Sequence, residues 1–350
     1  MKLKSFRYYI KKAHLYFGLF FGTPLVLIGL TGSILVSIFA IQDIPFVANP
    51  SHPFNADQIS RIVDALDEQN PNGKILSIKF PKEANDNIVA RMQFESKSQN
   101  ISISSNTFVV SEPNDGLTKL LVGLHSNFLI KNGDYFVGIC GIFLVILSIS
   151  GTILWYLQLS RIKLNTAAKL PRRILLKKIH YYTGLYTVCA LVFIGLSGLY
   201  LTFPNSIAGN LRSAIGARDF KSIKLESEIC NNPLHIGRIY EIAKISAPAG
   251  SEISNILFPS NLKQTYKLTF LGEKPTIIFI DQCGTILDKI DWNGYTASEK
   301  ALYFISAIHK SNVHGVFGWI WKLCQLIVGL SPIAFSVTGF MVYFGKKSPK

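Results

Sequence analysis

Histidines occupy matching points in two similar stretches of this chain, and histidine is a side chain with metal-binding chemistry. Residues 12–19 (KAHLYFGL) recur as residues 178–185 (KIHYYTGL). Leu124-His125 likewise recurs as Ile308-His309, ahead of an apolar run in each case. A neutral imidazole nitrogen is a common ligand of transition metals and of haem iron. The pattern predicts a duplicated protein with a site built across the interface between its two copies, and haem is the ligand that best suits such a site.

A hydroxyl residue followed by glycine recurs four times in the apolar runs. The pairs are Thr31-Gly32, Ser150-Gly151, Ser197-Gly198 and Thr338-Gly339. Further glycines in the first and third runs are Gly18, Gly22, Gly29, Gly184 and Gly195. Glycines leave room for a flat macrocycle, and they also let membrane helices pack closely. The sequence leaves both interpretations open.

Four apolar runs are long enough to cross a membrane, at residues 15–41, 136–159, 181–203 and 319–344. Each has about 20 residues or more, enough for a hydrocarbon core of about 30 Å, and none shows the polar face of a soluble helix. Hydrophobic residues make up 49% of the chain. We therefore expect an α-helical membrane protein, surrounded by lipid, whose four transmembrane helices form a tandem repeat of two.

The net charge of +15 comes from three short segments: the one before the first run, the one between the second and third, and the one after the fourth. Together they hold 15 basic residues and no acidic ones, so the remainder of the chain sums to zero. The positive-inside rule makes such segments cytoplasmic. This distribution argues against a nucleic-acid partner. It predicts a multi-pass protein of the bacterial inner membrane with both termini in the cytoplasm.

The two long segments between the runs then lie in the periplasm, and each has the pattern of a small α+β module. Apolar residues at helical spacing in 57–69 and from Ile236 to Ala243 predict one helix in each. Apolar and alternating runs that follow predict about three strands in each. Cys230 and Cys283 lie in the second module, where a disulfide is permitted. The sequence does not establish that they pair.

A short amphipathic helix follows each module and leads back to the membrane, at residues 117–128 and 298–310. These helices carry His125 and His309. The expected division of the chain is an N-terminus and first span at 1–41, a first module at 42–134, a second span at 135–160, a basic cytoplasmic loop at 161–179, a third span at 180–203, a second module at 204–314, and a fourth span with a basic tail at 315–350.

These motifs, in this order, resemble the PepSY-associated transmembrane family, whose members alternate four membrane helices with periplasmic PepSY modules. The resemblance rests on the His-aromatic or His-Leu entries at His14 and His180, on the entries at His125 and His309, and on the four hydroxyl–glycine pairs. It covers essentially the whole chain. It implies a role in iron uptake, because some members resemble haem-bearing inner-membrane reductases of ferric siderophores.

The predicted topology restricts which histidines can share one iron. His14 and His180 each begin an outward-going helix, while His125 and His309 each precede an inward-going one. Ligands within one copy are therefore separated by most of the bilayer, and the pairs that can form join the two copies. Two haem b groups, one near each face, would give an electron path across the membrane. His314 lies only five residues after His309 and could replace or supplement it.

The function predicted from these features is a haem-dependent membrane oxidoreductase that reduces a ferric chelate of the siderophore type in the periplasm. No strand-to-helix GxGxxG fingerprint for a flavin or a nicotinamide cofactor is present, so a quinol or a partner reductase must supply the electrons. The alternative is a non-catalytic module whose PepSY segments bind or regulate a partner such as a peptidase. A transporter is a weaker alternative, because only two helices make up each repeat.

Overall fold

The computed structural model describes residues 2–42, 53–81, 87–95, 97–105, 107–111, 116–157, 172–220, 223–261, 263–272, 274–313 and 315–345. The chain divides into two compact units. A helical unit takes residues 1–43, 116–216 and 301–350, and a sheet unit takes residues 44–115 and 217–300. Most of the predicted basic loop, residues 161–171, and the C-terminal lysines lie outside the described residues.

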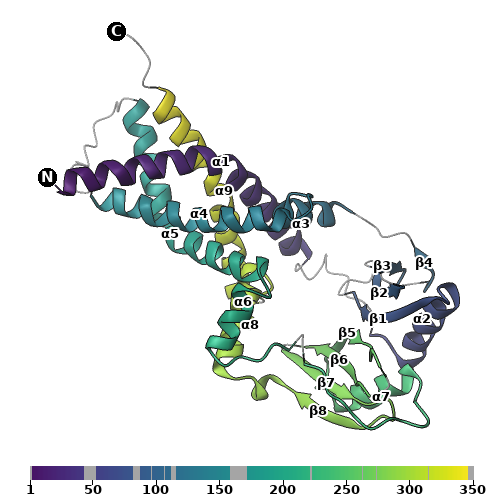
Figure 1. Ribbon diagram of the computed structural model, residues 1–350. Helices are drawn as coiled ribbons and strands as arrows, with labels where there is room; N and C mark the ends of the chain where they lie inside the picture. The colour runs from purple at the N-terminus through teal and green to yellow at the C-terminus, as the bar shows by residue number, and fades with distance from the viewer. Residues whose placement is uncertain are drawn as a thin grey trace. The chain divides into compact units, whose positions relative to one another are not determined.

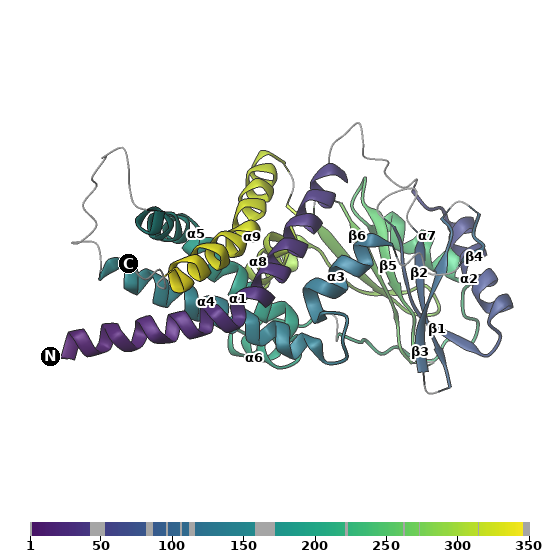
Figure 2. The ribbon, with the colours of Figure 1, turned by 90° about the horizontal axis from the view of Figure 1, so that it is seen from above.

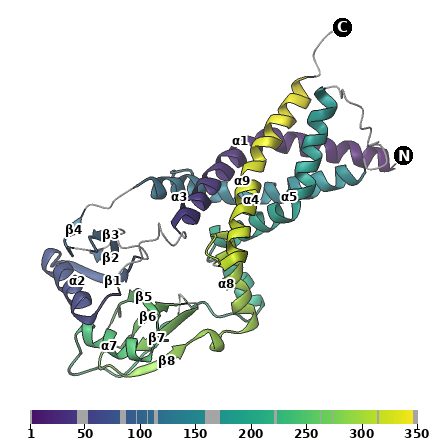
Figure 3. The same ribbon diagram turned by 180° about the vertical axis from the view of Figure 1, so that it is seen from behind.

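Four long helices form the body of the helical unit (Figures 1 and 3). They are α1 (Lys2–Gln42), α4 (Gly133–Tyr156), α5 (Arg172–Thr202) and α9 (Gly315–Phe344). Each is long and apolar enough to span a membrane, which confirms the four predicted spans. Helix α5 begins eight residues before the expected start at residue 180, so the end of the predicted basic loop is helical.

Glycine pairs permit two close helix crossings among the described residues of this unit. A Cβ atom added to Gly29 of α1 would lie 2.3 Å from the carbonyl oxygen of Gly329 in α9. One added to Gly195 of α5 would lie 3.2 Å from the carbonyl oxygen of Gly141 in α4. Side chains at these positions would push the backbones apart, because helices in a membrane approach this closely only through small residues. Close packing is therefore the role of Gly29 and Gly195.

Helix α9 continues through Pro332, although proline removes one helical hydrogen bond. The carbonyl of Val328, four residues earlier, loses its usual N–H donor there. The Ser331 hydroxyl donates to that carbonyl at 2.7 Å. Such side-chain compensation is what permits proline inside a membrane helix, so this span continues unbroken through Pro332.

Three shorter helices complete the helical unit: α3 (Leu117–Asn127), α6 (Ile207–Ala214) and most of α8 (Ala297–His309). Helices α3 and α8 agree with the two amphipathic helices that the sequence predicted. Helix α6 was not predicted. Helix α3 contacts both α1 and α4. Its last turn ends at Phe128, whose left-handed backbone (φ 53°) directs the chain into α4.

One antiparallel sheet of eight strands runs through the sheet unit (Figure 2). Its order is β4-β3-β2-β1-β5-β6-β7-β8. The strands are β1 (Gly73–Lys79), β2 (Ile88–Phe94), β3 (Lys97–Ile103), β4 (Val110–Ser111), β5 (Glu252–Leu257), β6 (Tyr266–Leu271), β7 (Pro275–Ile280) and β8 (Ile286–Ile290). Each predicted module supplies four strands rather than about three, and the pairing of β1 with β5 joins them into one sheet. Strands β4 and β8 escaped prediction because they are too short to show an alternating pattern.

Helices α2 (Ala56–Gln69) and α7 (Ile236–Ser246) pack against each other and against one face of this sheet. Asn55 and Gln58 form a capping box that starts α2. The core between helices and sheet is aliphatic and aromatic, and Ile62, Ile78 and Ile256 are among its fully buried members. A second, smaller core covers the opposite face of β7 and contains Ile277, Phe279, Ile290 and Tyr295.

Two links hold the second half of the sheet unit. The first is a disulfide between Cys230 and Cys283, whose Cα atoms lie 5.6 Å apart. The second is the buried carboxylate of Glu299 in the first turn of α8. It accepts two hydrogen bonds from the Arg218 guanidinium (2.7 and 2.9 Å) and others from the backbone N–H groups of Arg218 and Thr296. These donors, the Arg218 side chain above all, lower the pKa of Glu299 from 4.5 to about 2.

The lowered pKa of Glu299 predicts a pH-dependent loss of stability. A carboxyl group whose pKa is lower in the folded than in the unfolded protein stabilises the fold fully at a pH above its unfolded-state pKa. That contribution is lost as the pH falls toward the folded-state pKa. Glu299→Gln should destabilise the sheet unit by about 2 kcal/mol at pH 7, a figure reduced because the Arg218 side chain is 43% exposed. The difference in stability between the variant and the natural protein should shrink as the pH falls from 4.5 to 2, and thermal unfolding measures it.

Glu241→Gln is the matched control for this experiment. Glu241 forms an ion pair with Arg238 in which both side chains are exposed, and exposed pairs contribute little to stability. An equal effect of the two substitutions at pH 7 would contradict the assigned role of Glu299.

Candidate functional site

The structure brings four of the candidate histidines together as two pairs in the helical unit. His14 of α1 faces His180 of α5, with ring centres 6.3 Å apart. His125 of α3 faces His309 of α8, with ring centres 6.5 Å apart. Each pair joins the first half of the chain to the second, which is the pairing that topology predicted. His314 lies outside the described residues, and the ring that faces His125 is that of His309.

A hydroxyl group holds the Nδ1 atom of three of these rings. His14 Nδ1 lies 2.9 Å from Ser150 Oγ, and His180 Nδ1 lies 2.9 Å from Thr338 Oγ1. His309 Nδ1 lies 2.8 Å from Ser197 Oγ. The fourth ring, His125, has Nδ1 3.0 Å from the carbonyl oxygen of Ile28 and 3.4 Å from Thr31 Oγ1. The hydroxyl residues are those of the four hydroxyl–glycine pairs.

One protonation state satisfies all of these contacts. A carbonyl oxygen only accepts, so His125 Nδ1 donates to Ile28. The hydroxyls of Ser150, Thr338 and Ser197 can each donate to a carbonyl of their own helix, that of Leu147, Ala334 or Phe193, and accept from the ring with the same oxygen. With the proton on Nδ1, each imidazole keeps a free lone pair on Nε2, the form that binds a metal.

The glycine of each pair makes room for the ring that its neighbour holds. A Cβ atom added to Gly32 would lie 2.9 Å from Cε1 of His125, and one added to Gly151 would lie 3.2 Å from Cε1 of His14. The corresponding distances are 3.4 Å at Gly198 and 4.0 Å at Gly339. The first three are tight, so a side chain there would crowd the imidazole. Gly18, one turn after His14, is different, because its added Cβ would meet only Leu147 at 3.9 Å.

The two pairs lie far apart along the helices. His14 is on α1, whereas the ring of His125 is held at Ile28 and Thr31 of the same helix. Thr31 is 17 residues after His14, which is about 25 Å along an α-helix. The structure therefore contains two separate imidazole pairs rather than one cluster of four. Within the described ranges, no three His, Cys, Asp or Glu side chains gather as a metal-binding group.

Polar residues of α9 hold the end of α8 and so the backbone of His309. Gln325 Nε2 donates to the carbonyls of Ile308 and His309, both at 3.0 Å. Trp321 Nε1 donates to Ile308 at 2.8 Å. Gln325 is buried and also accepts from the hydroxyl of Ser311. A buried glutamine is unusual in a membrane span, and its bonds to the last α8 carbonyls explain Gln325.

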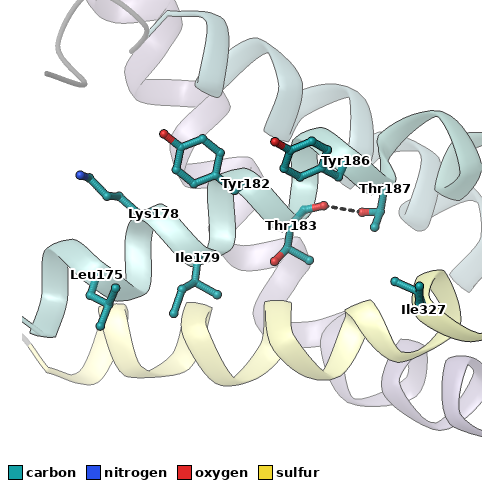
Figure 4. A pocket seen from close by; sticks show the side chains of 8 residues that line it. All are labelled: Leu175, Lys178, Ile179, Tyr182, Thr183, Tyr186, Thr187 and Ile327. Atoms are coloured by element: carbon teal, nitrogen blue, oxygen red, sulfur yellow. Dashed lines mark hydrogen bonds between the residues drawn. The ribbon is translucent and has the colours of Figure 1, made fainter. Parts of the chain in front are cut away.

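An apolar groove of about 570 Å³ runs along α5, the helix that carries His180 (Figure 4). One face of α5 lines it, and Ile327 of α9 closes its far end. The lining includes Ile179, Tyr182 and Thr183, which are sequence neighbours of His180. Figure 4 shows the Lys178 ammonium at one end and two tyrosine hydroxyls along the side. The Thr187 hydroxyl donates to the carbonyl of Thr183 at 2.8 Å, so this polar group of the groove already has a hydrogen-bond partner within α5.

Two groups of functional residues were not assigned from the sequence. The hydroxyls of Ser150, Thr338 and Ser197 were known only as members of a repeated pair, and the carbonyl of Ile28 carries no sequence signal. The constant interval from His14 to Thr31 and from His180 to Ser197 was a signal that these residues act together. It did not show that each hydroxyl contacts the other histidine of its own half.

Comparison with known protein families gives one finding that bears on these pairs. The family described as PepSY-associated TM region matches residues 11–346. The matched range contains all four histidines, all four hydroxyl–glycine pairs and the sheet unit. The curated proteins give no match to the chain.

Proposed function

Because the chain belongs to the PepSY-associated transmembrane family, we propose that it is a membrane haem protein that carries electrons across the bacterial inner membrane. It binds two haem b groups, one between His14 and His180 and one between His125 and His309. The electrons reduce a ferric chelate of the siderophore type in the periplasm. Reduction weakens the chelation of iron and frees it for uptake.

The observation that carries this proposal is the spacing of the two histidine pairs, together with the hydrogen bonds at their Nδ1 atoms. Two imidazole nitrogens bound at about 2 Å to one iron leave the ring centres roughly 6 Å apart. The ring centres here are 6.3 and 6.5 Å apart. Among the described residues, none hydrogen-bonds to Nε2 of these four rings. The donor set therefore fits the axial ligands of a six-coordinate haem.

Haem b supplies reversible one-electron transfer between ferric and ferrous iron. The protein residues supply binding and orientation. Ser150 and Thr338 hold the rings of the first pair, and Ser197 and Ile28 hold those of the second. A hydrogen bond from Nδ1–H also makes the imidazole a stronger donor to the metal. The separation of about 25 Å along α1 sets one pair near each membrane face.

The orientation follows from charge. The basic segments place both chain termini in the cytoplasm, which puts the His14–His180 pair at the inner face and the sheet unit in the periplasm. The matching intervals in the two halves support a tandem repeat of two spans, with the two PepSY-like modules sharing one sheet. Electrons then enter at the inner pair and leave at the outer pair.

A visible spectrum of the purified protein tests the haem groups. The detergent-solubilised protein, expressed with ample haem, should show a Soret band and an α-band in the reduced state. His14→Ala and His180→Ala should each remove the same haem and lower the haem content by about half. His125→Ala and His309→Ala should remove the other haem. Mixing the dithionite-reduced protein with ferric citrate should return the α-band to its oxidised form.

His235→Ala is the matched control. His235 contacts Ser60 and Asp64 in the sheet unit, so its replacement should leave both haems in place. A natural protein without a Soret band would contradict the haem proposal and favour the non-catalytic module that binds a partner. If His14→Ala and His180→Ala removed different haems, the pairing would be wrong.

Loss of a single hydroxyl should weaken the inner site without abolishing it. Ser150→Ala or Thr338→Val leaves Nδ1–H of one ring without its acceptor, and loss of such a partner typically costs about 10–100-fold in metal affinity. The measurements are haem retention during purification and the electron paramagnetic resonance of the ferric protein. Ser148→Ala is the control, because that hydroxyl donates to the carbonyl of Leu144 in the same helix. Equal haem loss in Ser148→Ala would contradict the proposed role.

We also propose a membrane quinol as the electron donor, since the groove along α5 is apolar and is lined by Ile179 and Tyr182, close in sequence to His180. Oxidation of a quinol would yield two electrons and two protons, so the two sites together would have to accept one electron each and the protons would pass to water. Duroquinol should reduce the natural protein, and Ile179→Trp, which fills the groove, should slow that reduction about tenfold. Leu196→Trp, another exposed position of α5, should not. If dithionite reduces the haems and duroquinol does not, the donor is not a quinol and the haem proposal stands.

A further inference from the structure

A row of side chains crosses the sheet unit at the junction of its two halves. Strand pairing places Arg91 of β2 opposite Ser77 of β1, and Ser77 opposite Leu257 of β5. Leu257 lies opposite Lys267 of β6. Directly opposed residues share one face of a sheet and lie about 5 Å apart. Arg91 and Lys267 therefore stand on the same face, three strand spacings apart, on either side of the β1–β5 junction.

This face is the one that α2 and α7 leave uncovered. Ile78 and Ile256, the neighbours of Ser77 and Leu257 along the strands, point to the helices and are fully buried. Alternation along a strand sends the row to the opposite side. There the segment that precedes α7 folds over the sheet and brings Ile223 and Lys224 to the row.

The row and this covering segment enclose a hollow of about 220 Å³ with a strongly basic lining. Three of its lining side chains are cationic: Arg91, Lys224 and Lys267. Neutral hydrogen-bonding groups come from Ser77, Ser260 and Gln264. The lining contains no carboxylate. Asp288 of β8 lies opposite Phe279 of β7 and outside the lining. Its charge acts on Arg218.

The hollow has a built wall rather than a cluster of mobile surface lysines. The Lys267 side chain is 8% exposed. Its ammonium donates to the carbonyl of Phe220 and lies 5.8 Å from the centre of the Phe279 ring. Arg91 is exposed at the rim and donates to Ser98 on the neighbouring strand at 3.1 Å. A side chain as buried as that of Lys267 loses little conformational entropy when a ligand binds.

We propose that this hollow binds a small oxyanion, a carboxylate or phosphate compound that carries at least two negative charges. The hollow is smaller than the roughly 300–1,000 Å³ of sites for drug-sized ligands, so the ligand is small. Guanidinium and ammonium groups with hydroxyl and amide neighbours are the donors that recognise carboxylate and phosphate oxygens. Two or more charges on the ligand match a lining with three cations. This site lies wholly in the sheet unit and does not depend on the haem proposal.

Calorimetric titration of the full-length protein in detergent tests the site, with citrate and inorganic phosphate as the two probes at constant ionic strength. We expect saturable binding of at least one probe. Arg91→Gln and Lys224→Gln should each weaken it about tenfold, as expected for the loss of one charge-assisted hydrogen bond. Both side chains are exposed at the rim, so both variants should fold. Tighter binding of citrate would identify a carboxylate ligand, and tighter binding of phosphate a phosphate ligand.

Lys79→Gln is the matched control. Lys79 lies on the same face of β1 as Ser77, two residues along the strand, and is exposed outside the lining. Its replacement removes the same charge from the same face and should change the affinity less than twofold, since long-range electrostatics alone are screened by salt. Equal weakening by Lys79→Gln would show a diffuse charge effect and overturn the proposal. Absence of saturable binding of both probes would overturn it as well.

Discussion

An imidazole N–H that lies among apolar helices needs an acceptor, because an unpaired polar group in such surroundings costs several kcal/mol. In this protein three acceptors are hydroxyls that already donate to their own helix, and the fourth is the carbonyl of Ile28. A proton on Nδ1 of each ring satisfies these contacts and leaves Nε2 without a hydrogen-bond partner among the described residues. The orientation and chemistry of all four histidines depend on this arrangement. The glycines beside the hydroxyls leave the space that the rings need in this arrangement.

The hydrogen bonds lie within each half of the chain, while the facing rings come from different halves. His14 is held by Ser150 and His180 by Thr338, so each ring is held by a residue of its own half. The distance between the rings is then set by how the halves pack. The close crossings at Gly29 with Gly329 and at Gly195 with Gly141 determine that packing, because both join helices of different halves. A larger side chain at either crossing would separate the rings without touching a histidine.

The sequence predicted what depends on local pattern and long hydrophobic runs. The four spans, helices α2, α3, α7 and α8, and the pairing of the histidines across the halves all follow from periodicity and topology. The joining of the two modules through β1 and β5 could not be predicted in this way. Each of these strands is short, and nothing in its sequence distinguishes a free strand edge from a paired one. The ion pair of Arg218 with Glu299 also joins residues far apart in sequence, and only the fold brings them together.

The two halves differ in how firmly their second histidine is held. Helix α8 is fixed at its start by the buried Glu299 carboxylate and at its end by Gln325 and Trp321, which bind its last carbonyls. Helix α3 begins at Gly116 without a side-chain cap. The ring of His125 instead depends on a backbone carbonyl of α1, the helix that also carries His14. A shift of α1 would therefore move one ring of each pair together, whereas α8 would hold His309 in place, and this couples the geometry of the two pairs through a single helix.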